Sequence, residues 1–179
     1  MKVLVVDESA ERAEVLREGL RRAGYEVAAS LSSPLALLRT IEQLRPDIIV
    51  IDTESPSRDV LEHLVVLSQH TPRPVVMFAT DGAPETIRKA VRAGVSAYVV
   101  DGLDPARVKG IVDAALATFE EFQRLRQQLA ERKSVERAKA ILMKKHRLDE
   151  ASAYSMLRKI AMDRNLRIGE VAQRVIDGA

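Results

Sequence analysis

Residues 48–52, Ile-Ile-Val-Ile-Asp, form a short run of β-branched apolar residues that ends in an acid. Such a run predicts a strand buried on both faces, as in parallel sheets that are covered by helices. The start of the chain repeats the pattern in Lys2-Val-Leu-Val-Val-Asp7. Three more strands are expected over residues 25–30, 74–79 and 97–100, so the sequence predicts a five-stranded parallel sheet.

Segments with apolar residues at helical spacing separate the expected strands. Val15, Leu16 and Leu20 predict a helix over residues 10–23, and Gly24 is a typical stop signal after it. Four more helices are expected over residues 34–44, 59–69 and 85–93 and from Asp104-Pro105 onward. Alternating strands and helices predict an α/β fold with a doubly wound sheet.

The carboxyl ends of the expected strands collect acidic residues. In doubly wound sheets the functional crevice lies at these ends. They carry Asp7-Glu8, Asp52, Ala79-Thr80 and Asp101. The concentration of acids at one edge of the sheet is the first indication of a site.

The helix that starts near Asp104 has no stop signal until residues 147–149. Apolar residues recur along it at spacings of three and four, namely Val112, Ala115, Phe119, Phe122, Leu125 and Leu129. This coiled-coil-like seam favours pairing with a second copy of the chain. Packing of Phe119 and Phe122 on the first domain is an equally good interpretation. Two shorter helices follow, and the first is expected to bury Ala153, Met156, Leu157, Ile160 and Ala161.

Residues 135–143, Val-Glu-Arg-Ala-Lys-Ala-Ile-Leu-Met, combine an apolar stripe with a basic face. The cations in and around this stretch are Arg132, Lys133, Arg137, Lys139, Lys144 and Lys145. The net charge is −3 through Phe119 (14 Lys and Arg against 17 Asp and Glu) and +5 from Glu120 onward (14 against 9). An acidic first module and a basic second one place any polyanion on the second. A solvated surface helix is the plain alternative.

Composition excludes several classes of protein. Of the 179 residues, 46% are hydrophobic and 30% are charged, which is typical of a globular protein. No apolar run approaches the roughly 20 residues that span a bilayer, and the acids at the end of the first apolar run are unlike a signal peptide. The absence of cysteine excludes disulfides, thiolate metal ligands and thiol nucleophiles. We expect a cytoplasmic protein without a membrane partner.

Three stretches make the first 118 residues resemble a response-regulator receiver domain, which has a flavodoxin-like fold. They are Val5–Glu8, Ile48–Asp59 and Arg92–Val100. The resemblance implies that Asp7, Glu8 and Asp52 hold Mg²⁺ and that Asp52 accepts a phosphoryl group. It also implies that Glu54 supplies a metal-binding backbone carbonyl. Oxygen ligands suit this hard cation, which would neutralise charge during phosphoryl transfer. We expect no required cofactor, and Mg²⁺ only at this pocket.

Two positions depart from the receiver pattern. Receivers carry Ser or Thr at the end of the fourth strand, where the alignment places Ala79, with Thr80 displaced by one residue. The receiver lysine after the fifth strand is replaced by Asp101, which removes a partner of the phosphoryl oxygens and adds repulsion. An acid there also makes protonation of Asp52 easier. These departures argue against switching driven by phosphorylation.

The last part of the chain, about residues 132–176, resembles an ANTAR domain, the RNA-binding module of antiterminators. The resemblance is carried by Ala138-Lys139, Leu142-Met143, Asp149-Glu150, Ala153-Tyr154, Leu157-Arg158, Ala161-Met162 and Val171-Ala172. The small and apolar members are interpreted as packing three short helices. The residues expected to contact RNA are therefore exposed polar ones. The first candidates are Lys139, Tyr154, Arg158, Lys159 and Arg164, and further candidates are Arg137, Lys144 and Lys145. Tyr154 is ambiguous, since an aromatic residue at helical spacing is more often part of a core.

Within ANTAR proteins, the chain is most similar to the nitrate/nitrite-responsive antiterminators of the NasT type. The similarity is carried by residues 51–56 (IDTESP), 72–78 (PRPVVMF) and 93–100 (AGVSAYVV) and by Asp101. ANTAR proteins bind paired hairpins in leader transcripts, so that a terminator does not form. The similarity implies control by a nitrate/nitrite sensor of the NasS type, which sequesters the regulator, and a homodimer suits a pair of hairpins.

The sequence therefore predicts a receiver-like domain over residues 1–118, a helical coiled-coil linker over 119–132 and a three-helix ANTAR domain over 133–179. Three alternatives stay open: a phosphorylation-activated ANTAR regulator, a DNA-binding response regulator and a protein-binding adaptor. Residues 162–167 are poorly marked as the tight turn of a helix-turn-helix motif.

The chain has three histidines, His63, His70 and His146. None has a paired nucleophile in the sequence pattern, so no enzyme is expected.

Overall fold

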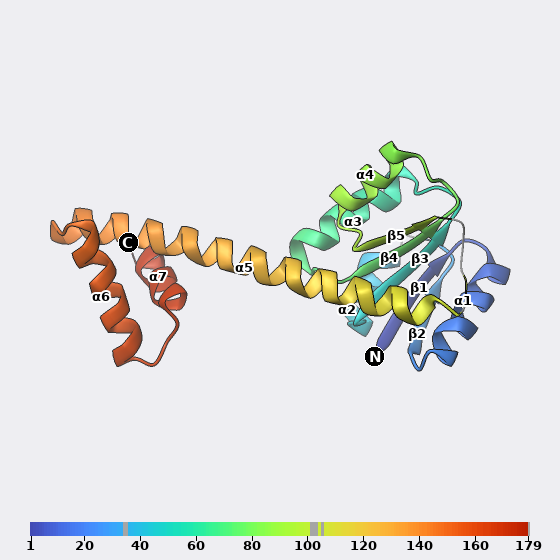
Figure 1. The fold of residues 1–179 in the computed structure, drawn as a ribbon, viewed down its shortest axis with the longest axis horizontal. Helices are drawn as coiled ribbons and strands as arrows, with labels where there is room; N and C mark the ends of the chain where they lie inside the picture. Colours follow the sequence, from blue (N-terminus) through green and yellow to red (C-terminus); the bar gives the residue numbers. More distant parts are fainter. Residues whose placement is uncertain (34–35, 101–103, 105, 179) are drawn as a thin grey trace. The chain divides into compact units, whose positions relative to one another are not determined.

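The computed structural model describes residues 1–33, 36–100, 104 and 106–178. The chain divides into two compact units, Met1–Glu120 and Glu121–Ala179. One helix, α5 (Val108–His146), is continuous from the first unit into the second (Figure 1). The predicted domain boundaries, after residues 118 and 132, both fall inside this helix, so they stay predictions.

The first unit is built on a parallel sheet of five strands in the order β2-β1-β3-β4-β5. The strands are β1 (Lys2–Asp7), β2 (Glu26–Leu31), β3 (Ile48–Thr53), β4 (Val75–Ala79) and β5 (Ala97–Val100). Each strand agrees with its predicted range to within one residue. The strand order reverses beside β1, so the carboxyl ends of β1 and β3 meet at the point where a crevice opens in such sheets.

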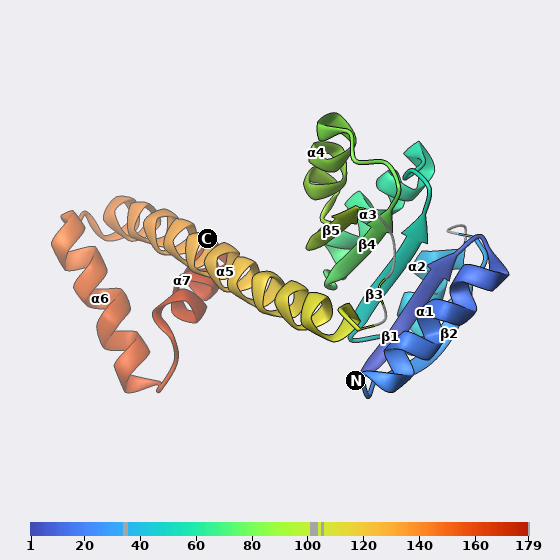
Figure 2. The ribbon, with the colours of Figure 1, turned by 45° about the vertical axis from the view of Figure 1, so that its right-hand side comes forward.

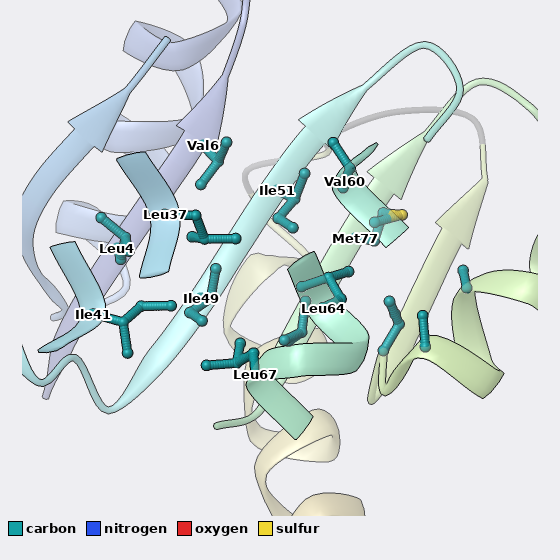
Figure 3. Packing of buried hydrophobic residues seen from close by; sticks show 14 residues of the cluster. Leu4, Val6, Leu37, Ile41, Ile49, Ile51, Val60, Leu64, Leu67 and Met77 are labelled. Carbon is teal, nitrogen blue, oxygen red and sulfur yellow. The ribbon is translucent and has the colours of Figure 1, made fainter. Parts of the chain in front are cut away.

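Helices cover both faces of the sheet. They are α1 (Ala10–Arg22), α2 (Leu37–Leu44), α3 (Arg58–His70), α4 (Pro84–Ala93) and the start of α5. Alternate residues of a strand point to opposite faces, so Val3 and Val5 pack with α1 and α5, whereas Leu4 and Val6 pack with α2 and α3. Figure 3 shows the second cluster, in which Leu37, Ile41, Leu64 and Leu67 point toward the strands. Burial of both faces explains the continuous apolar runs in the sequence.

Local signals place the helix ends. The hydroxyls of Ser9 and Ser57 accept hydrogen bonds from backbone amides in the first turns of α1 and α3. Gly94 ends α4 with φ of 107°, and a Cβ there would lie 2.8 Å from Ser68 Cβ, so α3 and α4 approach closely only with glycine. The helix expected from Asp104 begins at Val108 instead, because a turn comes first, in which Arg107 N donates to Asp104 O. Pro34, Leu35 and Pro105 lie outside the described residues.

The second unit consists of the last part of α5 with α6 (Glu150–Asp163) and α7 (Ile168–Asp177), which lie beside it (Figures 1 and 2). Its core contains Val135, Ala138, Leu142, Ala153, Leu157, Ala161, Val171 and Ala172. Left-handed backbone at Arg147 and Asn165 follows the ends of α5 and α6. The carboxylate of Asp149 caps α6 by accepting from Ser152 N.

Two apolar residues at helical spacing are exposed. Val15 of α1 is 49% exposed and Met156 of α6 is 36% exposed. Their neighbours Leu16 and Leu157 are fully buried. The predicted burial of Met156 is wrong because the buried stripe of α6 is narrower than predicted, whereas the helix that Val15 helped to predict is present. No helix in the described part of the chain is long and apolar enough to cross a membrane.

Candidate functional site

Two carboxylates lie side by side at the carboxyl end of the sheet. Asp7 ends β1, Asp52 lies one residue before the end of β3, and the parallel register pairs them. Both are buried, with 2% and 9% of their surface exposed. Glu8 and Glu54 are exposed. Of the four predicted metal-site residues, the structure therefore brings two carboxylates together inside the protein and leaves two at its surface.

The guanidinium of Arg12 reaches this acidic pocket from the first turn of α1. Its nitrogens lie 3.5 Å from Asp7 Oδ1, 3.8 Å from Asp52 Oδ2 and 3.8 Å from Glu54 Oε1. The cap at Ser9 fixes where α1 starts and so places Arg12 beside the pocket. Arg12 was not predicted as a site residue, although its position in the first turn of a predicted helix was the available signal.

Burial and charge repulsion both act on Asp52. Loss of hydration and the neighbouring charge of Asp7 raise the pKa of Asp52 from 3.8 to about 6, and the Arg12 guanidinium offsets part of this shift. The sequence predicts easier protonation of Asp52 from Asp101, which lies outside the described residues. The direction of the pKa shift agrees with that prediction, whereas its cause in the described part of the chain is burial next to Asp7.

Replacing Asp52 by Asn is expected to stabilise the first unit near neutral pH. The pKa of Asp52 is higher in the folded protein than in the unfolded chain, so the folded protein tolerates the neutral carboxyl better than the charged one. The stability that the neutral carboxyl provides is fully present below about pH 4 and is lost as the pH rises through about 6, where Asp52 becomes charged. Because the pocket opens to solvent, we expect Asp52→Asn to raise the free energy of unfolding at about pH 7.5 by about 1–2 kcal/mol, less than the whole pKa shift implies.

Urea unfolding of wild type and Asp52→Asn at about pH 4 and about pH 7.5 measures this effect. The matched control is Glu26→Gln, at an exposed carboxylate of β2 in the same unit. A stabilisation by Asp52→Asn that is equal at both pH values would contradict the raised pKa.

The ligands of a divalent cation are not assembled at the acidic pocket. The backbone carbonyl of Glu54 accepts from the amides of Thr80 (3.1 Å) and Asp81 (2.9 Å). Asp7 Oδ2 is buried without a hydrogen-bond partner, but Arg12 already faces the other oxygen of that carboxylate. Among the described residues there is no group of three or more histidines and acids that could hold a metal ion. The residues as arranged do not fit the Mg²⁺ ion that the receiver resemblance implies.

The end of β4 offers no hydroxyl to the pocket, because Ala79 is buried there. The next loop is organised by Asp81, whose carboxylate accepts from Ser55 Oγ (2.8 Å) and Thr86 Oγ1 (2.9 Å). Its backbone carbonyl accepts from Tyr98 Oη at 2.7 Å. A backbone amide and these hydroxyls hold the pKa of Asp81 below its usual value. Asp81 therefore connects the loop after β3 with α4 through its carboxylate and the loop after β4 with β5 through its backbone carbonyl.

Lys139, the first of the predicted RNA contacts, is buried. Only 7% of its surface is exposed. Its Nζ donates to Glu150 Oε1 (2.6 Å) on α6 and lies 2.9 Å from Glu136 Oε1 on α5. Hydrogen bonds to both glutamates raise the pKa of Lys139. The predicted exposure of Lys139 is wrong, since this side chain joins α5 to α6.

Reversing the charge of Lys139 is expected to loosen the packing of α6 on α5, because Lys139→Glu places a third carboxylate beside Glu136 and Glu150. Lys139→Met keeps an unbranched chain of similar length and removes only the ion pairs. We therefore expect the melting temperature to fall clearly in Lys139→Glu and only slightly in Lys139→Met. Thermal unfolding followed by circular dichroism measures both variants, and an equal loss in the two would contradict the role of the charge.

The other predicted RNA-binding cations are exposed. They are Arg137, Lys144 and Lys145 on α5, Arg158 and Lys159 on α6, and Arg164 directly after α6. The ion pairs of the second unit within the described residues include Lys139 and Arg124 but none of these six. Their charge is thus available to a polyanion without loss of an existing ion pair.

The helix α6 also exposes two large side chains beside these cations. Tyr154 is 45% exposed and Met162 is 72% exposed. With Arg158 between them they are spaced by four residues and share one face of α6. The interpretation of Tyr154 as a core residue is wrong. Met162 belongs to the ANTAR-like pattern, whose apolar members are interpreted as packing residues, and its exposure contradicts that interpretation.

The predicted seam along α5 lies in two different environments. Val112 and Ala115 are buried in the core of the first unit. The exposed part consists of Phe122 (57%), Leu125 (50%) and Leu129 (56%). Packing of Phe119 and Phe122 on the first domain, the other interpretation, stays a prediction. The part of the seam that is free to pair is therefore the short run from Phe122 to Leu129.

Residues 3–113 match the family model of the response regulator receiver domain, which covers more than half of the chain and every strand of the sheet. The chain belongs to the response regulator receiver family. Residues 123–176 of this response regulator match the ANTAR domain, so the exposed face of α6 lies within an ANTAR domain.

Solved structures agree with the receiver fold. A two-component response regulator of the LuxR family from Aurantimonas sp. SI85-9A1 has a TM-score of 0.58 and 28% identity, and the match covers 65% of this chain and 84% of that one. The predicted fold class is confirmed: a five-stranded parallel, flavodoxin-like sheet is followed by a long helix and short helices.

Two sequence relatives differ in how much of the response regulator they match. The transcriptional regulatory protein PdtaR from Mycobacterium tuberculosis is 27% identical over 183 residues, which cover 98% of this chain and 89% of that protein. A protein-glutamate methylesterase/protein-glutamine glutaminase from Thiobacillus denitrificans is 35% identical over 102 residues, 55% of this chain and 29% of that protein. The likeness to that enzyme is partial, whereas the likeness to the transcriptional regulator extends over both units.

Proposed function

We propose that this response regulator is an RNA-binding antitermination regulator, which binds paired hairpins in leader mRNA and prevents formation of a terminator. The observation that carries the proposal is the exposed face of α6 within the ANTAR domain. There Tyr154, Arg158 and Met162 lie in line, with Lys159 beside them. Hairpin loops present unstacked bases together with phosphates, which suits a surface of one aromatic ring, one apolar chain and unpaired cations.

Binding of leader hairpin RNA by the full-length protein tests this function. We expect the affinity to fall steeply with salt, because neutralised phosphates release counterions. We expect duplex DNA not to compete. Equal competition by duplex DNA would favour a DNA-binding response regulator, and absence of salt-dependent binding to either nucleic acid would favour a protein-binding adaptor.

We further infer that the target transcripts serve nitrate and nitrite assimilation and that a sensor protein of the NasS type holds the regulator in an inactive complex. The similarity of residues 51–56, 72–78 and 93–100 to NasT-type regulators supports this inference. So does Ala79, which leaves the end of β4 without a hydroxyl for a phosphoryl group. RNA pulldown and sequencing from cells grown with and without nitrate tests the targets, and recovery of nitrate-independent targets alone would overturn the inference.

A phosphorylation-activated ANTAR regulator is the second candidate, and the pairing of Asp7 with Asp52 at the end of the sheet favours it. Incubation with acetyl phosphate separates the two forms of control. Stable phosphorylation of Asp52 with a parallel rise in RNA affinity would favour activation by phosphorylation over sequestration by a sensor.

A further inference from the structure

We propose that the guanidinium of Arg12 is a built-in cation that takes the place of a metal ion at the acidic pocket and excludes divalent cations from it. The proposal concerns the receiver domain and does not depend on RNA binding. The receiver resemblance implies a Mg²⁺ site here, but the residues that would form it are arranged around Arg12 instead.

Arg12 lies close to three acidic side chains at the pocket. Its three guanidinium nitrogens lie within 4 Å of three different carboxylates, those of Asp7, Asp52 and Glu54. Arg12 Nε is buried, has no hydrogen-bond partner and lies 3.8 Å from Asp52 Oδ2. Among the described residues, no other cation forms an ion pair with these carboxylates. The guanidinium thus sits between the acids as a shared counter-charge.

Electrostatics favours this arrangement over an empty pocket. Asp7 and Asp52 are neighbours across β1 and β3, and two buried carboxylates without a counter-charge repel each other. A guanidinium is planar and delocalised, so one side chain can face several carboxylates together. Arg12 is also tied to the helix that begins at the pocket, which keeps its charge there without a bound ligand.

A divalent cation would have to displace Arg12, because two cations in one small pocket repel each other. The pocket would also offer this cation few further ligands. The carbonyl of Glu54 is held by two backbone amides, and Glu8 is exposed to solvent. Removal of Arg12 alone, however, leaves the carboxylates of Asp7 and Asp52, and Mg²⁺ can bind to one or two carboxylates while it keeps several waters.

A titration of the full-length protein with MgCl₂ tests the proposal, followed by the backbone amide signals of Asp7 and Thr53 in NMR spectra. We expect no saturable shift in wild type and saturable shifts in Arg12→Met, with an affinity at least about tenfold higher. Urea unfolding gives a second readout: Mg²⁺ should raise the midpoint of Arg12→Met and leave that of wild type unchanged. The matched control is Arg22→Met on the same helix, since Arg22 pairs with Glu18 and lies away from the pocket.

Saturable Mg²⁺ binding by wild type with the affinity of Arg12→Met would overturn the proposal. An Arg12→Met variant that is folded and still binds no Mg²⁺ would overturn it as well, because Arg12 would then not be what excludes the metal. Should Arg12→Met fail to fold, Arg12→Gln, which retains polar atoms in the pocket, takes its place under the same two criteria.

Discussion

Reversing the charges of Arg158 and Lys159 together is expected to lower the affinity of the full-length protein for leader hairpin RNA by about 100-fold. Both residues are exposed on α6 within the ANTAR domain, and neither takes part in the ion pairs of the described residues. The loss of two phosphate contacts on single-stranded loops should also reduce the slope of log affinity against log salt concentration by about 1.4. Gel-shift titrations over a range of salt concentrations measure both quantities.

Two single variants control for charge and for folding. Arg88→Glu on α4 makes the same kind of charge change at an exposed site of the receiver unit, and we expect less than about a twofold effect. Lys139→Met removes a cation that Glu136 and Glu150 already neutralise, and we expect less than about a threefold effect. A loss in Arg88→Glu as large as that in the double variant would show that net charge alone, and no specific face, attracts the RNA.

The sheet could be predicted from sequence because its physical cause is local. An inner strand of a sheet that is covered on both faces must be largely apolar, and runs such as residues 48–51 meet that demand without knowledge of their neighbours. The faces of surface helices are less determined. Val15 and Leu16 fit the helical spacing equally well, and only packing against the sheet makes one 49% exposed and the other fully buried.

The candidate sites were also predictable only in part. The pairing of Asp7 with Asp52 follows from strand order and register, which the apolar pattern indicates. The ion pairs of Arg12 and Lys139 form where a long side chain reaches from one element to another. The distance between two such elements cannot be deduced from the spacing of residues in the sequence. Lys139 is the instructive error, since a lysine beside an apolar stripe was predicted to face solvent and instead bridges two helices.

The apolar seam along α5 predicts a homodimer, and replacing Leu125 and Leu129 by Asp is expected to separate that dimer into monomers and to lower the affinity for RNA with two hairpins by about 100-fold. Phe122, Leu125 and Leu129 are spaced by three and four residues and are each at least half exposed. Apolar side chains at this spacing pack against the same residues of a second helix. A dimer carries two ANTAR domains, so the second hairpin binds within the complex at a high effective concentration.

RNA with a single hairpin separates loss of pairing from loss of the binding face. We expect its affinity to change by less than about twofold in the double Asp variant, because avidity needs two linked sites. Val91→Asp on α4 is the matched control, since Val91 is 56% exposed, as is Leu129, and lies outside the seam. Sedimentation equilibrium measures the oligomeric state. Since neither leucine belongs to the core of the second unit, its melting temperature should be retained. A double variant that keeps full affinity for two hairpins would contradict pairing through α5.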